Sequence, residues 1–402
     1  MLSPLTLGDP VRIAHISDFH LRHHLPGNSL AYKRRGRAVG DLLAAAIEEI
    51  NGLAPDLLAV TGDLIDYPLR RLDDPETGRL GLEDLQLVKN LLSKANCPVA
   101  HLYGNHDHPE HFQDLFGDEP LERDIRGYRV VTFLDEEGEG NHPERKDPER
   151  ARFDQVLADP DTRPQIHLQH YLVWPRQVTG YPHSYRDAPA LKNAIVASGR
   201  VRLILSGHYH RGYNLFEEEG VWFSTATAFC EFPHAFRTYD LTDTTVTERV
   251  HTLEDRMKRK PAVFIDHDRL LAGLSNSVTG TRALRRLSEA GYLLVATIFG
   301  DGASRGAVEI EATSDELFAT LDRQDIEVDG LICRFDQEQD VAELLSDVSH
   351  AIRISSAHSH FFTLDEEEAG RARDAGIPNT HTVAPTVEDF ARRALEICGV
   401  RP

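Results

Sequence analysis

The chain has 402 residues, 41% of them hydrophobic, and its 65 acidic and 44 basic side chains give a formal net charge of −21. At about 100–200 residues per domain, this length predicts two domains or more, and no apolar stretch reaches the roughly 20 residues that a membrane span requires. Because so acidic a chain repels polyanions at long range, we expect no nonspecific coat of nucleic acid and no membrane partner.

The first two-thirds of the chain alternate apolar strands with amphipathic helices. Strands are predicted at 11–17, 56–60, 98–103, 166–168 and 201–205, and short alternating runs over 221–250 predict a meander of strands. Helical periodicity covers 37–52 and 82–94, whereas the polar, proline-containing segment 143–152 predicts a surface loop. This order of elements is typical of an α/β fold.

A polar cluster follows each strand at its C-terminal end. The clusters are Asp18-Phe19-His20, Gly62-Asp63, Gly104-Asn105-His106-Asp107, Gln169-His170 and Gly207-His208-Tyr209-His210. Ligands of α/β proteins bind at the carboxyl ends of strands, and two imidazoles at i and i+2 beside a glycine suit metal coordination. A polar turn explains each of the first two clusters better than a metal site does when that cluster is taken alone.

The ordered series DxH, GD, GNHD, H and GHxH resembles the signature of the calcineurin-like metallophosphoesterases over about residues 11–250. The resemblance implies a sandwich of two central β-sheets flanked by helices, with two divalent metal ions. It implies that Asp18, His20 and His210 hold the first ion, that Asn105, His170 and His208 hold the second, and that Asp63 bridges both. His167 and His183 are the alternatives to His170, which we prefer because it directly follows the strand 166–168.

The resemblance also assigns His106 as the general acid that protonates the leaving-group oxygen, with Asp107 orienting it through a hydrogen bond. Carboxylates mixed with imidazoles suit manganese, iron, zinc or cobalt, and we expect manganese. Two such ions would clamp a phosphate and activate a water for attack on it. No protein nucleophile is then required.

We therefore expect a metal-dependent phosphoesterase that hydrolyses phosphomonoesters or phosphodiesters, including nucleotides or nucleic-acid ends. One alternative is a cyclic-nucleotide phosphodiesterase, and another is a non-catalytic, metal-bound regulatory scaffold. The basic segment 33–37, the pair His23 and His24, and Tyr209 are candidates for substrate contacts, although a solvated helix start explains the basic segment equally well.

A basic break at 256–261 precedes a second alternation of strands and helices, so we place the domain boundary near residue 258, between domains 1–257 and 258–402. Strands are predicted at 262–266 and 292–297, and helices at 279–290, 341–345 and 387–397. This spacing predicts a Rossmann-like α/β domain with a parallel sheet. Its first strand ends in Asp266-His267-Asp268.

This second domain resembles the haloacid-dehalogenase superfamily, closest to its histidinol-phosphatase-like branch, through 262–268, 284–297, 300–306 and 368–377. The resemblance implies Asp266 as nucleophile, Asp268 as acid/base and Thr297 as phosphate-binding residue. However, Arg269 replaces an expected glycine, no lysine follows Lys260, and the magnesium-binding Gly-Asp expected before Glu368 is missing. These departures argue against a magnesium site, so we predict a catalytically degenerate domain used for structure, homo-oligomerisation or ligand sensing.

The four cysteines Cys97, Cys230, Cys333 and Cys398 lie far apart, and none forms a CxxC pair. This spacing argues against a disulfide framework and against a cysteine zinc site. We therefore expect a protein of the reducing cytoplasm.

Overall fold

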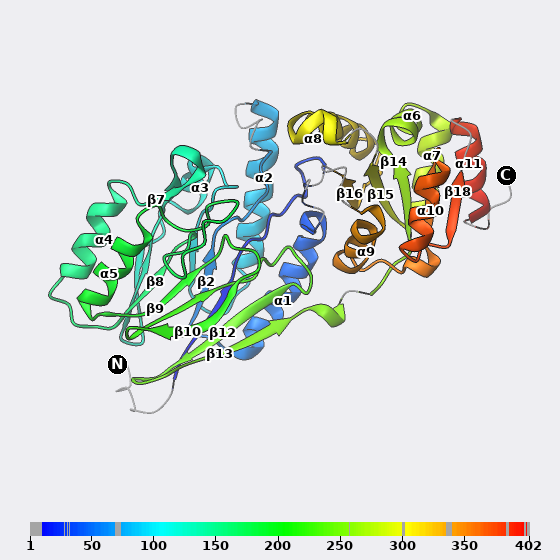
Figure 1. Ribbon diagram of the computed structural model, residues 1–402. Helices are drawn as coiled ribbons and strands as arrows, with labels where there is room; N and C mark the ends of the chain where they lie inside the picture. The colour runs from blue at the N-terminus through cyan, green and yellow to red at the C-terminus, as the bar shows by residue number, and fades with distance from the viewer. Residues whose placement is uncertain are drawn as a thin grey trace. The chain divides into compact units, whose positions relative to one another are not determined.

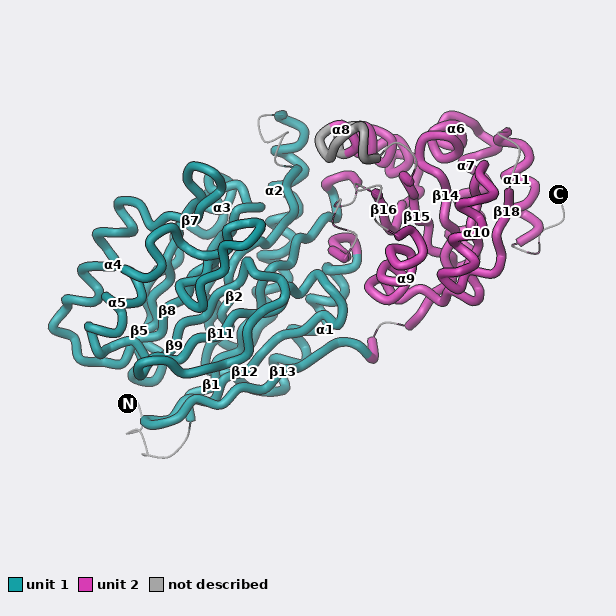
Figure 2. Tube along the Cα trace, viewed as in Figure 1, with its two compact units in different colours: residues 1–24, 38–254 teal, residues 25–37, 255–402 magenta. Residues whose placement is uncertain are grey.

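The computed structural model describes residues 10–27, 29, 31, 33–68, 74–256, 258–299, 302–334, 340–382, 386–397 and 399. The chain divides into two compact units, of which unit 1 comprises residues 1–24 and 38–254, and unit 2 comprises residues 25–37 and 255–402 (Figure 2). Cys398 and residues 300 and 301 of the predicted segment 300–306 lie outside the described residues. Among the described residues, no helix is both long and apolar enough to cross a membrane.

Unit 1 is a sandwich of two β-sheets (Figure 1). The first sheet has the order β13-β12-β1-β2-β3, with β1 at Val11–Ile16, β2 at Leu57–Thr61, β3 at Val99–Leu102, β12 at Ala235–Leu241 and β13 at Val246–Thr252. The second has the order β10-β11-β9-β8-β5-β4, with β4 at Glu122–Ile125, β5 at Tyr128–Thr132, β8 at Gln165–Leu168, β9 at Val201–Ser206, β10 at Tyr213–Glu218 and β11 at Val221–Thr225.

One apolar cluster joins the two sheets and forms the core of the sandwich. Ile13 and Leu57 from the first sheet share it with Ile166 and Leu203 from the second, and all four side chains are buried. Because successive strand residues point to opposite faces, each sheet also presents a second face to helices. The predicted pair of central sheets is therefore confirmed.

Helices cover the outer faces of the sandwich. They are α1 at Val39–Leu53, α2 at Pro75–Leu92, α3 at Pro109–Phe116, α4 at Glu149–Ala158 and α5 at Ala188–Ser198. The amphipathic face predicted for α1 is confirmed, since the residues buried along it recur at helical spacing. Helix α2 begins well before the predicted residue 82, because the Asp74 carboxylate caps it by accepting a hydrogen bond from the Thr77 N–H, and Pro75 occupies its first turn.

Two predictions for unit 1 were wrong. Segment 143–152 is not only a loop, since it holds β7 at Pro143–Glu144, which pairs with β6 at Glu136–Glu137, and the start of α4. Burial of Phe153 and Val156 against the second sheet stabilises α4, and this tertiary packing is invisible in a polar sequence. Nor is 221–250 one meander, because β12 and β13 form an antiparallel pair in the first sheet, whereas β11 runs parallel to β9 in the second.

Unit 2 contains a sheet of parallel strands in the order β16-β15-β14-β17-β18. The strands are β14 at Ala262–Asp266, β15 at Leu293–Ile298, β16 at Gly330–Cys333, β17 at His360–Thr363 and β18 at Asn379–Thr382. The helices are α6 at Ala272–Ser275, α7 at Val278–Glu289, α8 at Gly302–Asp322, α9 at Val341–Ala351, α10 at Glu366–Asp374 and α11 at Val387–Ile397. Val263 and Phe264 enter different apolar clusters, so the sheet is covered on both faces.

The basic segment before α1 belongs to unit 2. The Arg35 guanidinium donates a hydrogen bond of 2.9 Å from Nη1 to the Ile352 carbonyl, and Arg37 forms an ion pair with Asp322. These two cations of the predicted substrate-contact segment are therefore engaged by groups of unit 2.

Candidate metal centre

Five strand ends of unit 1 deliver the residues of the predicted metal site to one place. Asp18 and His20 follow β1, Asp63 follows β2, and Asn105 follows β3, all in the first sheet; His170 follows β8, and His208 and His210 follow β9, in the second. Backbone hydrogen bonds tie these loops together, from the Asp18 N–H to the Gly62 carbonyl and from the Gly207 N–H to the His170 carbonyl. Neighbouring parallel strands therefore position both halves of the site.

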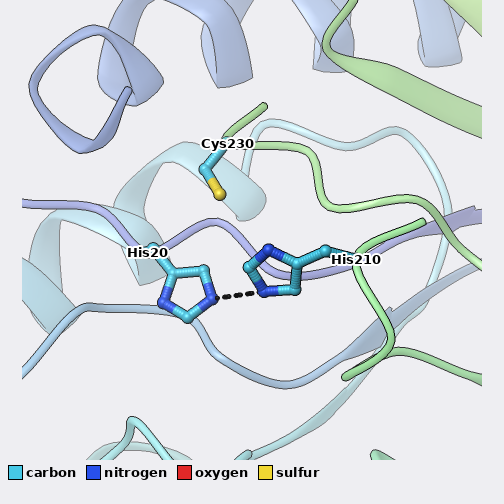
Figure 3. Close-up of side chains that lie close together, drawn as sticks. All are labelled: His20, His210 and Cys230. Carbon is cyan, nitrogen blue, oxygen red and sulfur yellow. Dashed lines mark hydrogen bonds between the residues drawn. The ribbon is translucent and has the colours of Figure 1, made fainter. Parts of the chain in front are cut away.

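The first group of donors surrounds the imidazoles of His20 and His210. Their Nε2 atoms lie 3.1 Å apart. The dashed line in Figure 3 marks this contact. The Asp63 Oδ2 atom lies 3.3 Å from Nε2 of His20, and the Asp18 Oδ1 atom lies 3.7 Å from Nε2 of His210. The four ligand atoms lie within 4.8 Å of one another, which is a spacing that one cation can fill.

The second group shares Asp63 with the first. Its other carboxylate oxygen, Oδ1, lies 3.4 Å from Nε2 of His170, and that nitrogen lies 3.3 Å from Oδ1 of Asn105. The ligand atoms of Asp63, His170 and His208 also lie within 4.8 Å of one another. Asp63 thus stands between two sets of donors, with one oxygen facing each. The structure brings together all seven residues predicted for the metal site.

The chemistry and packing of these residues fit metal ions. His208 is buried, and among the described residues its Nε2 atom has no hydrogen-bond partner, which is a costly arrangement for a polar atom without a ligand. The lack of a side chain at Gly104 leaves room for two donors, because a Cβ there would lie 2.2 Å from Oδ1 of Asp63 and 2.5 Å from Nε2 of His170. The glycine of the GNHD motif therefore keeps the donor cradle open.

The backbone of the site is strained where it carries ligands. Asp18, His20, Asp63 and His208 have positive φ angles of 57°, 43°, 51° and 66°. Non-glycine residues adopt this left-handed conformation uncommonly, and such residues gather at functional sites. Four of the seven predicted ligands are therefore held in place by the surrounding hydrogen bonds and not by local preference.

Charges and burial in the site shift Asp63 and His208, but not His170, toward the form that binds a cation. Burial opposes ionisation of Asp63, but the neighbouring His170 and His20 outweigh burial and hold the pKa of Asp63 well below its ordinary value. Burial lowers the pKa of His170, but the Asp63 carboxylate outweighs it and raises the pKa to about 9. Burial, with the charge of His170, holds the pKa of His208 well below its ordinary value. A cation that binds here must displace the proton from His170.

The predicted general acid, His106, lies at the edge of this cluster and is partly exposed. Its Nδ1 atom lies 3.0 Å from Oδ1 of Asp66, and its ring packs edge-on against the His20 ring at 4.7 Å. The Asp107 carboxylate instead accepts hydrogen bonds from the backbone N–H groups of Leu64 and Gly104, among others. The structure therefore differs from the predicted hydrogen bond between Asp107 and His106: Asp107 fixes the loop, and Asp66 is the carboxylate that lies beside the His106 ring.

Sequence reasoning missed three residues of the site. Asp66 also lies 3.4 Å from Nδ1 of His20, and Glu231 accepts a hydrogen bond of 2.6 Å from Nδ1 of His210. Figure 3 shows the Cys230 sulfur directed at the two imidazoles, and this thiol lies within 4.8 Å of a nitrogen of each. The position of Asp66, three residues after Asp63, was a usable signal, whereas the loop after β11 gave none.

The residues predicted for unit 2 lie together but not as a metal site. Asp266 ends β14 and is the register partner of Thr297 on β15. However, Asp266 accepts a hydrogen bond of 2.7 Å from the Arg269 N–H, and Oδ1 of Asp268 lies 2.7 Å from Nδ1 of His267. Among the described residues of unit 2, no three metal-ligating side chains converge.

Three comparisons place these features among known proteins. The family model described as calcineurin-like phosphoesterase matches residues 11–212. The chain is 27% identical over 214 residues to a "Probable cyclic nucleotide phosphodiesterase" of Synechococcus sp., covering 50% of this chain and 74% of the relative. It is 26% identical over 213 residues to a protein of the same description from Pseudoalteromonas sp., covering 50% and 72%. A solved structure of a dimetal phosphatase from Danio rerio aligns with a TM-score of 0.51 at 19% identity, covering 61% of this chain and 97% of that one.

Proposed function

The chain belongs to the calcineurin-like phosphoesterase family, as a metal-dependent hydrolase of phosphate esters, and on that premise we propose how its residues divide the work. Asp18, His20 and His210 hold one divalent cation, Asn105, His170 and His208 hold the other, and Asp63 bridges them. The observation that carries this assignment is Asp63, whose two oxygens face two separate donor groups. A bridging carboxylate is what a centre with two cations requires.

When bound, two cations would neutralise the phosphate oxygens and lower the pKa of a water that attacks phosphorus. The protein's own contribution is orientation and proton transfer. His106 donates a proton to the leaving-group oxygen, and Asp66 holds its ring through the contact with Nδ1. Glu231 fixes the ring of His210 in the same way, which leaves Nε2 available as the atom that would bind a cation.

We propose phosphodiesters as the substrates, with cyclic nucleotides as the leading class. The names of the two bacterial relatives support this choice, and both relatives align over the part of the chain that contains the site. Phosphomonoesters and nucleic-acid ends are the alternatives. We propose manganese as the metal, from the group of manganese, iron, zinc and cobalt that mixed carboxylate and imidazole donors suit.

We propose that residues 1–257, apart from the segment 25–37 that belongs to unit 2, form the phosphoesterase domain and residues 258–402 a haloacid-dehalogenase-like domain without catalytic activity. The parallel sheet of unit 2 supports the assignment of residues 258–402, because its strand order reverses at β14, as in doubly wound α/β folds. Ligands of such sheets bind at the point of reversal. The engaged carboxylates of Asp266 and Asp268 support the loss of activity. The domain then serves structure, homo-oligomerisation or ligand sensing.

Metal removal and return test the proposed function. The chain is stripped with a chelator, reloaded with Mn²⁺, and assayed on p-nitrophenyl phosphate and bis-p-nitrophenyl phosphate. We expect activity to fall to background and to return with about two Mn²⁺ bound per chain, measured by elemental analysis, and the diester to be the better substrate. Full activity of the stripped protein, or saturation at a single ion, would contradict the proposal.

A further inference from the structure

Four aromatic side chains lie beside the predicted second metal site and have no part in holding it. They are Tyr181 and His183, on the loop after β8, and Tyr209 and Tyr213, on the loop after β9 and the start of β10. We call this group the aromatic rim. Tyr181 is 39% exposed, which makes it one of the few large hydrophobic side chains that the described part of the chain shows to solvent.

The aromatic rim is continuous with the metal-site residue His208. The ring centroids of Tyr181 and His183 lie 5.7 Å and 5.0 Å from that of His208. His183 packs edge-on against Tyr209 at 5.0 Å, and Tyr209 stacks on Tyr213 at 5.1 Å with an interplanar angle of 19°. A phosphate held at the metal site would therefore have a row of aromatic rings next to it.

Two hydrogen bonds hold the ends of the aromatic rim. The Tyr181 hydroxyl donates to Oε1 of Glu137 at 2.5 Å, and the Tyr213 hydroxyl donates to Oε1 of Gln177 at 3.4 Å. Rings that are already fixed lose little conformational entropy when a ligand stacks on them. This feature is typical of a binding surface and is not needed for packing, because the core of the second sheet lies elsewhere.

The charges around the aromatic rim favour a substrate that carries few phosphate groups. Glu137 lies at the Tyr181 end, Glu231 lies beside His210, and the chain as a whole carries a net charge of −21. A substrate with a second or third phosphate would be repelled there. A planar, uncharged group linked to a single phosphate is favoured, and nucleobases stack readily on aromatic side chains.

We propose that the aromatic rim binds the base of a nucleoside phosphate whose phosphate occupies the metal site, with Tyr181 as the main stacking residue. This inference rests on the proposed function and deepens it, because it makes the base the group that the enzyme selects. Tyr181 is a specificity residue here and takes no part in the chemical step. Its removal should weaken the binding of nucleotides more than the binding of sugar phosphates.

Product binding tests this proposal without requiring turnover. The Mn²⁺-loaded full chain is titrated by calorimetry with adenosine 5′-monophosphate and with ribose 5-phosphate, which differ by the base alone. We expect the nucleotide to bind wild type about tenfold more tightly than the sugar phosphate, the range for one stacked base. Tyr181→Leu should abolish this preference, whereas Tyr181→Phe, which keeps the ring and loses the hydrogen bond to Glu137, should retain most of it.

Two results would overturn the aromatic rim as a base site: equal affinity of wild type for both ligands, or an unchanged preference in Tyr181→Leu. The rate of hydrolysis of bis-p-nitrophenyl phosphate, measured on the same samples, separates this failure from a failure of the proposed function. If that diester is hydrolysed with Mn²⁺ but the base makes no difference to binding, only the inference about the aromatic rim fails.

Discussion

Units 1 and 2 both place carboxylates at the C-terminal ends of parallel strands, yet among the described residues only unit 1 gathers them into groups of candidate metal ligands. In unit 1 the side chains of Asp18, Asp63 and their histidine neighbours point to common centres. In unit 2 Asp266 is bonded to the backbone N–H of Arg269, and Asp268 pairs with His267. A strand end thus provides a position for a ligand, whereas a site also needs several donors that converge on one point.

The electrostatic surroundings of Asp63 in unit 1 and of Asp266 in unit 2 shift the two pKa values in opposite directions. Histidines around Asp63 hold its pKa well below the ordinary value despite burial. At Asp266, burial dominates and raises the pKa to about 6, against smaller opposing effects of Arg269. Glu368, which adds to this shift, lies 2.6 Å from the Thr363 hydroxyl. The Asp63 carboxylate is therefore ionised and ready for a cation, whereas Asp266 gives up its proton only as the pH rises through about 6.

The largest expected effect is that of removing Asp63, the proposed bridging residue of unit 1, whereas removal of its counterpart Asp266 in unit 2 should have no effect. Asp63→Ala should lower hydrolysis of bis-p-nitrophenyl phosphate about 10³-fold or more, because a metal ion supplies several kcal/mol of transition-state stabilisation. Elemental analysis should show fewer than two Mn²⁺ per chain. Asp266→Ala is the matched control, with activity and metal content unchanged. If the two variants lost activity equally, the contrast between the units would be wrong.

Next in size is the loss of the general acid. His106→Ala should slow hydrolysis by about 10²–10⁴-fold for esters with a poor leaving group, and by less for p-nitrophenyl esters, whose leaving group needs little protonation. The measurement is kcat for a series of aryl and alkyl diesters. Asp268→Ala, which removes the corresponding predicted acid of unit 2, should leave the whole series unchanged. A uniform decrease across the series for His106→Ala would exclude proton donation.

A smaller effect is expected for the residue that positions this acid. Asp66→Asn should reduce kcat about 10–100-fold, the usual range for a residue that orients a ligand or catalytic group, and should steepen the leaving-group dependence. Asp107→Asn should instead lower the free energy of unfolding by about 1–3 kcal/mol, because its new amide group would face the backbone N–H groups that the carboxylate now accepts from. A lower kcat in Asp107→Asn, with an unchanged kcat in Asp66→Asn, would restore Asp107 as the residue that orients His106.

The smallest effect concerns pH and unit 2. The folded pKa of Asp266 is about 6, above the value of about 3.9 in an unfolded chain. Its stabilising contribution is therefore fully present below pH 4 and is lost as the pH rises through 6. Asp266→Asn, which keeps an acceptor for the Arg269 N–H, should raise the melting temperature by about 2–4 °C at pH 8, after allowance for partial exposure, and by nothing at pH 4. A gain of equal size at both pH values would mean that the charge of Asp266 is not its cause.

Most of what could be predicted about the site came from the positions of the polar motifs in the sequence. Each cluster follows an apolar strand, so the sequence alone indicated which side chains would meet at one sheet edge. The sandwich of two sheets followed from the resemblance. The contribution of β11 to the second sheet could not be predicted, because a parallel partner such as β9 is chosen by tertiary packing and not by local alternation.

The supporting residues were harder to predict than the donors. Asp66, Cys230 and Glu231 enter the site from loops whose course depends on contacts between strands far apart in the sequence, such as the hydrogen bond from the Cys230 N–H to the Asp18 carbonyl. Asp107 was misassigned because adjacency to His106 in the sequence suggested contact. In the folded loop its carboxylate turns to the backbone of Leu64 and Gly104.

The left-handed backbone at Asp18, His20, Asp63 and His208 has a consequence for the engineering and evolution of this enzyme. Strain at such positions costs of order 1–3 kcal/mol each, and glycine would relieve it. A search that selects variants for thermal stability alone would therefore favour glycine at the very positions that we propose as ligands of the cations. Selection for stability should be run with the metal present and with activity scored in parallel, because here a more stable chain and a working enzyme are different goals.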